Sequence, residues 1–128
     1  MWWFNKGKRI DIWDEDIQWP IGDIEAVHRI RDICAAAADI AEKVGGFADR
    51  PDNKKNKSET ERYERAAKAA MEIAIKISDG LMRDSALRQI VNLCVKANNL
   101  RTARTLLRAI QFVSIREDLL KDHPMLRQ

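Results

Sequence analysis

The sequence of 128 residues predicts an all-α protein: about five helices stacked as antiparallel hairpins in a right-handed α-solenoid, preceded by a tryptophan-rich N-terminal arm. Three observations lead to this fold class. Residues 100–120 repeat the pattern of residues 67–87, apolar residues recur at helical spacing, and helix-stop signals divide the chain into segments. A repeat of this length is typical of helical hairpins that bury their apolar faces on one another.

The two copies of the repeat agree in apolar and in charged positions. They match at an offset of 33 residues, as in Ala70 with Ala103, Ile73 with Leu106, Ile77 with Ile110, Arg83 with Arg116, and Asp84 with Glu117. This agreement continues from one helix through a turn into the start of the next. We therefore expect both copies to form the same helix–turn–helix unit.

The arm, residues 1–22, differs from the helical domain that we expect over residues 23–128. It contains all four tryptophans of the chain, namely Trp2, Trp3, Trp13 and Trp19. Residues 5–12 suit a short hairpin. The aromatic residues suit a lid over an exposed helix face or a contact between copies of the chain in a homo-oligomer. A membrane partner is not expected, because the acidic run at 14–16 would be repelled by anionic lipid.

The first two helices follow from their end signals. Asp23 is a plausible N-cap for a helix that ends at Gly45–Gly46. A polar loop over 46–58 follows, because residues 49–57 include a proline and no apolar residue. Ser58 and Glu61 have the spacing of a capping box, which predicts a second helix that stops at 78–80.

Three shorter helices complete the prediction. The third runs from about Arg83 to Ala97, where Asn98–Asn99 ends it and caps the fourth helix, residues 100–112. A second capping box, Ser114 to Glu117, predicts a final helix that Pro124 ends.

The third and fourth helices follow the spacing of a known repeat family. Apolar residues stand where that pattern has Trp, Leu, Gly, Tyr, Ala and Phe, namely Leu87, Ile90, Val91, Cys94, Ala103 and Leu107. Over residues 59–122 the chain thus resembles a tetratricopeptide repeat, although the family's Trp, Gly and Tyr are absent and Ile115 replaces its closing Pro. The resemblance implies a concave groove that holds a peptide or a partner helix.

Composition narrows the class of protein. The chain is 45% hydrophobic and 34% charged, which excludes disorder, and it has no run of about 18 apolar residues that could span a membrane. We expect a cytoplasmic protein. Cys34 and Cys94 lie within apolar helical patterns, so we expect them to be reduced and buried.

No catalytic or cofactor signature appears in the sequence. Glu25 and His28 have the spacing of a di-iron motif, but no second copy exists, so we expect no metal and interpret His28 with Asp32 as a surface ion pair. The apolar settings of both cysteines raise a thiol pKa. Glycine-rich phosphate loops and nucleophile elbows are missing. We therefore expect neither enzymatic activity nor a cofactor.

The charge distribution indicates a basic surface. Residues 1–57 carry 10 Lys/Arg against 11 Asp/Glu, whereas residues 58–128 carry 13 against 9. No acid occurs between Asp84 and Glu117, and the candidate partner-binding residues in that interval are Arg88, Lys96, Arg101, Arg104 and Arg108. The last three fall within about 60° on a helical wheel.

This surface leaves three interpretations open. Its arginines can select an acidic segment of a protein partner, which predicts a non-catalytic interaction or assembly module. They can also pair with acids of the chain itself. The alternative function is a small nucleic-acid-binding protein that uses the surface over 85–116, where Phe112 is the one aromatic residue available for stacking.

Overall fold

The computed structural model describes residues 11–47 and 54–127. These residues are helical apart from short linkers and contain no strand, which confirms the predicted all-α class. In chain order the elements are η2 (Ile12–Asp14), α1 (Asp23–Gly45), α2 (Lys54–Ala74), α3 (Gly80–Lys96), α4 (Leu100–Ala109), α5 (Val113–Asp122) and η4 (Pro124–Arg127). The elements η2 and η4 are short 3₁₀ helices.

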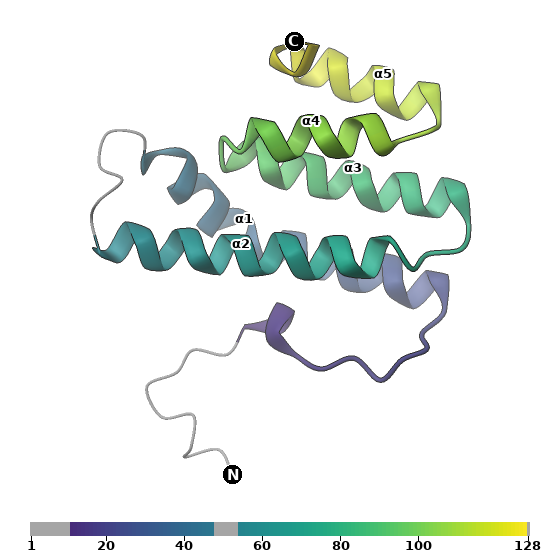
Figure 1. The fold of residues 1–128 in the computed structure, drawn as a ribbon, viewed down its shortest axis with the longest axis horizontal. Coiled ribbons are helices and arrows are strands. Elements are labelled where there is room, and N and C mark those ends of the chain that lie inside the picture. Colours follow the sequence, from purple (N-terminus) through teal and green to yellow (C-terminus); the bar gives the residue numbers. More distant parts are fainter. Residues whose placement is uncertain (1–10, 48–53, 128) are drawn as a thin grey trace.

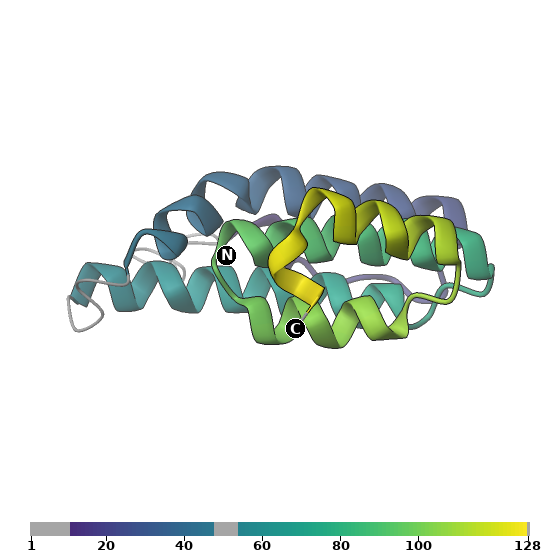
Figure 2. The same cartoon turned by 90° about the horizontal axis from the view of Figure 1, so that it is seen from above.

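The α-helices of the described residues lie in two layers. Figure 1 shows α1 with α2, then α3 with α4, then α5 as three successive tiers. In Figure 2, α1, α3 and α5 form one layer, and α2 and α4 form the other. α1 packs against α2 and α3, and α3 packs against α4 and α5. The chain thus stacks its helices in sequence order.

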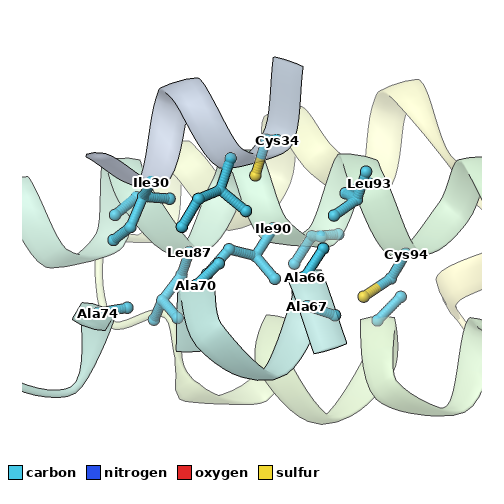
Figure 3. Packing of buried hydrophobic residues seen from close by; sticks show 14 of the residues in the cluster. Ile30, Cys34, Ala66, Ala67, Ala70, Ala74, Leu87, Ile90, Leu93 and Cys94 are labelled. Carbon is cyan, nitrogen blue, oxygen red and sulfur yellow. The ribbon is translucent and has the colours of Figure 1, made fainter. Parts of the chain in front are cut away.

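A single cluster of buried apolar side chains connects the tiers and extends from Trp13 to Leu126. Where α1, α2 and α3 meet, Ile30 and Ile90 are fully buried and point toward the alanine-rich face of α2 around Ala70 (Figure 3). Alanines on that face let the backbones approach closely, and the larger side chains fill the remaining space at the density of a protein interior.

α1 ends where the sequence predicts, and its last residue touches the end of α3. A methyl group on Gly45 would overlap the carbonyl oxygen of Lys96 and lie 3.4 Å from its carbonyl carbon. On Gly46 the nearest atom, the carbonyl oxygen of Lys43, would be 3.5 Å away, which is ordinary contact. Gly45 therefore permits the close approach of two helices, whereas Gly46 serves the helix end alone.

The predicted break at Asn98–Asn99 is confirmed, and its hydrogen bonds explain it. Asn98 has a φ of 58°, and its N–H donates to the carbonyl of Val95 at 2.9 Å. The N–H of Asn99 donates to the carbonyl of Cys94 at 2.8 Å, which completes a Schellman motif. The Asn99 side chain then accepts a hydrogen bond from the Thr102 N–H and caps α4.

The predicted N-cap of α1 is wrong, because the side chain concerned has a different partner. Gly22 is the N-cap, and Asp23 is the first helical residue. The Asp23 carboxylate accepts hydrogen bonds from the N–H groups of Ser78 and Asp79 at 3.0 and 2.9 Å. It therefore holds the linker before α3, and these two bonds lower its pKa.

The predicted capping box at Ser114 is also wrong. α5 begins one residue earlier, at Val113, with Phe112 as its N-cap. The fully buried Asp84 of α3 accepts hydrogen bonds through Oδ2 from the N–H groups of Gln111 and Phe112, at 3.0 and 2.9 Å. A carboxylate from a neighbouring helix thus satisfies the groups that a local cap would serve.

The predicted capping box at Ser58 fails for another reason. α2 begins four residues earlier, at Lys54, so that the polar loop is shorter than expected. Lysine is a good helix former, and the side chain of Thr60 donates to the carbonyl of Asn56 at 2.8 Å within the helix. The rest of that loop, residues 48–53, lies outside the described residues.

Three other helix ends differ from the prediction by three or four residues. α2 ends at Ala74, and α4 ends at Ala109. α3 begins at Gly80 because Asp79 accepts a hydrogen bond from the Met82 N–H at 2.9 Å and acts as its N-cap. The linker before α5 is correspondingly longer than expected, whereas the linker before α3 is shifted toward the N-terminus, because both of its boundaries lie earlier in the chain.

The described part of the arm is attached to α2 through an arginine. Trp13 of η2 is only 7% exposed and belongs to the buried cluster. The buried Arg62 donates from Nη2 and Nε to both carboxylate oxygens of Asp11, at 2.7 and 3.1 Å. This pairing raises the Arg62 pKa, and the guanidinium carbon lies 5.8 Å from the centre of the Trp13 ring. The segment Asp11–Asp14 is therefore a packed part of the domain.

The remaining expectations for the arm have mixed outcomes. Ile12 lies in a 3₁₀ helix, so it does not form the second strand of the predicted hairpin. Trp2 and Trp3 lie outside the described residues. Trp19 is 41% exposed, in contrast to Trp13.

Candidate functional site

The predicted arginine face lies on α4, in the layer that also contains α2. Arg101 and Arg108 are exposed and form no ion pair with any residue that the structure describes. They are two helical turns apart, which is about 10.5 Å along the axis. Arg104, between them, donates from Nη2 to the carbonyl of Met125 at 2.9 Å, which fixes η4 against α4. Two guanidinium groups of this face are thus available to a partner.

The other two predicted basic residues belong to a different surface. Arg88 and Lys96 lie on α3, in the opposite layer, and each faces an acid of the same chain. The Arg88 Nη1 is 3.7 Å from Asp118, and the Lys96 Nζ is 3.7 Å from Glu42. Arg88 and Lys96 therefore pair with acids of the chain itself, which was one of the three interpretations of the basic surface. Arg101 and Arg108 form no such pair with any described residue.

A second candidate site, which sequence reasoning missed, is a groove where the arm crosses α1 and α2. It has a volume of about 590 Å³. Its apolar lining comes from three separate segments of the chain: Ile12, Trp13, Ile17, Trp19, Ile33, Ala69, Ile73 and Ile75. Both tryptophans that we singled out within the described residues contribute to this groove.

The charged lining of the groove is predominantly acidic. Six charged side chains line it, namely Glu15, Asp16, Asp32, Glu72, Arg29 and Lys76. The Arg29 Nε is already 3.1 Å from Glu25, outside the groove. The Lys76 ammonium lies over the Trp19 ring, 4.3 Å from its centre. The acidic groups thus outnumber the cations, and both cations have partners.

Three titratable side chains of the core, two thiols and one phenol, have pKa values raised by burial. Burial raises the pKa of the Cys34 thiol to about 12 and also raises that of Cys94. Burial likewise raises the pKa of Tyr63, whose hydroxyl accepts a hydrogen bond from the Asn99 amide at 2.9 Å. These groups keep their protons at neutral pH, so the thiols are poor nucleophiles.

The motif at Glu25 and His28 also has a structural explanation. The Glu25 carboxylate pairs with Arg29 one turn along the helix. Asp32 lies 3.9 Å from the Arg31 Nε, so the ion pair expected between His28 and Asp32 is replaced by one with arginine.

Comparisons with protein-family models, curated proteins and solved structures give no match to this chain. Its function must therefore be argued from the two surfaces themselves. Within residues 11–47 and 54–127, no helix is both long enough and apolar enough to cross a bilayer.

Proposed function

We propose that this chain is a non-catalytic protein-binding module, built as a right-handed array of helical hairpins of the tetratricopeptide type. Two features support this architecture. α3 begins at residue 80 and α5 at residue 113, the same offset of 33 residues as the sequence repeat. A carboxylate also binds two consecutive N–H groups in the linker before each of these helices.

The observation that carries the proposed function is the pair of exposed arginines on α4. Arg101 and Arg108 point to a partner segment with carboxylates about 10 Å apart, since guanidinium groups bind carboxylates bidentately. The intervening Arg104 contributes to the positive potential while it anchors η4. An acidic protein segment fits this face better than a nucleic acid, because no aromatic side chain lies on α4 to stack on bases.

A titration of the full-length protein with a fluorescein-labelled acidic peptide tests this function. We expect the double variant R101E/R108E to bind at least tenfold more weakly, a loss of about 1.4 kcal/mol. The matched control R31E/K68E makes the same change in net charge at exposed positions on α1 and α2, and it should retain binding within about twofold.

Two results would overturn the proposal. The first is an equal loss of affinity in both double variants, which would mean that net charge alone governs binding. The second is tighter binding of single-stranded or duplex DNA than of the acidic peptide, with the steep salt dependence that counterion release produces.

A further inference from the structure

The groove between the arm, α1 and α2 has an apolar floor. Ile33 and Ile73 are buried at its base, and Ile17 is half-buried beside them. Its volume of about 590 Å³ is in the range of sites that enclose a small molecule or several side chains of a peptide. The floor therefore favours a ligand that has apolar groups.

Its rim favours positive charge. Glu15, Asp16 and Glu72 form no ion pair with any residue in the described part of the chain. Arg29 is neutralised by Glu25, and Lys76 is then the one remaining cation of the lining against these three carboxylates, so the mouth of the groove keeps a net negative potential. Charge complementarity then selects a cationic partner over an acidic one.

The Trp19 ring shows how a cation would be held. The Lys76 ammonium lies 4.3 Å from the ring centre, within the range of a cation–π contact. Lys76 is an exposed residue on the linker after α2, so its flexible stem can swing into solvent. The ring therefore accepts an ammonium group and can exchange this one for another.

We propose that the groove binds a lysine side chain carried by an apolar segment of a partner protein. The ligand ammonium takes the place of Lys76 on the Trp19 ring, the rim carboxylates balance its charge, and neighbouring apolar side chains cover the isoleucine floor. This site goes beyond the proposed function, because it needs neither arginine of α4 and selects the opposite charge.

The test uses the full-length protein and a labelled peptide Gly-Leu-Lys-Leu-Gly, with Gly-Leu-Glu-Leu-Gly as the comparison ligand. Fluorescence anisotropy gives the affinities, and the indole N–H signal of Trp19 in NMR spectra reports occupancy. The isosteric variant D16N/E72Q removes two rim charges. Its control E61Q/E64Q removes two exposed charges of α2 that do not line the groove.

We expect the lysine peptide to bind and to shift the Trp19 signal, and the glutamate peptide not to bind. D16N/E72Q should weaken binding about threefold to tenfold, and the control should not. The variant K76A should strengthen binding about twofold to fivefold, because it removes a competing cation from the ring. R101E/R108E should leave this affinity unchanged, which separates this site from the proposed function.

Three outcomes would overturn the inference. The first is equal affinity for the lysine and glutamate peptides, and the second is weaker binding of the lysine peptide by K76A. The third is an equal affinity of D16N/E72Q and its control E61Q/E64Q for the lysine peptide. The occupant would instead be a second copy of the chain if the protein alone formed a dimer in sedimentation experiments and D16N/E72Q dissociated it.

Discussion

The substitution Asp84→Ala tests whether a buried carboxylate of α3 fixes the position of α5. Asp84 is fully buried, and Oδ2 accepts hydrogen bonds from the N–H groups of Gln111 and Phe112 at 3.0 and 2.9 Å. A hydrogen bond to a charged acceptor contributes about 1.5–3 kcal/mol. The second carboxylate oxygen of Asp84, Oδ1, is buried and has no hydrogen-bond partner among the described residues, and removing that atom recovers part of the cost of desolvation.

The net effect of Asp84→Ala should therefore be a loss of about 2–4 kcal/mol in the free energy of unfolding. Asp84→Asn should lose less than Asp84→Ala, because the amide oxygen can occupy the Oδ2 position and accept both bonds, although a neutral acceptor makes them weaker and the amide NH2 takes the buried Oδ1 position. Glu117 is the equivalent position of the repeat in α5 and is exposed, so Glu117→Ala should change stability by less than about 0.5 kcal/mol.

Urea denaturation followed by circular dichroism measures all three variants. The midpoint should fall for Asp84→Ala with an unchanged slope, because the surface exposed on unfolding stays the same. Equal midpoints for Asp84→Ala and Glu117→Ala would refute the role that we assign to this carboxylate.

Other features of the fold make three further predictions. Gly45→Ala should lower the free energy of unfolding by about 2 kcal/mol or more, because the added methyl group overlaps the backbone of Lys96. Gly46→Ala should lie within about 0.5 kcal/mol of the parent protein in the same urea assay. Equal stability of the two variants would contradict the close approach of α1 and α3 at Gly45. The lowered pKa of Asp23 means that its stabilisation is complete above its ordinary value of 3.8 and is lost as the pH falls further, so Asp23→Asn should flatten the acid limb of stability against pH. Cys34 and Cys94 should react with a thiol reagent at pH 8 only after unfolding, and rapid reaction of the folded protein would show that they are not buried.

Local signals in the sequence predicted those features whose causes are local. Asn98 and Asn99 make their capping hydrogen bonds with residues at most five positions away, and Gly46 bonds to the preceding turn. Short-range chemistry of this kind can be recognised without knowing the fold.

Two of the wrong helix starts, those of α1 and α5, have causes that lie elsewhere in the chain. Ser114 is not needed as a cap because Asp84, 27 residues before Gln111, supplies the acceptor. Asp23 is used 55 residues away, at Ser78. Prediction of a helix cap from the sequence uses only the residues next to the helix end. It therefore misses an acceptor that lies far away in the sequence and comes close only in the folded structure.

The candidate sites were predictable to different degrees. The arginines of α4 share a single helix, so their spacing alone places them on one face. The groove is different, since Asp16, Asp32 and Glu72 reach it from three segments of the chain. The tryptophans were the one available signal for it, yet composition could not distinguish the buried Trp13 from the exposed Trp19.

The carboxylates of Asp23 and Asp84 have a consequence for how the protein loses its structure. In stacked hairpins, a weak interface allows a terminal unit to fray while the rest stays folded. Here each carboxylate reaches past one helix to the linker of the next tier, so that opening α3 near Asp84 would release the start of α5 at the same time. Neighbouring tiers are thereby coupled, which favours unfolding as one cooperative unit over stepwise loss from the C-terminal end.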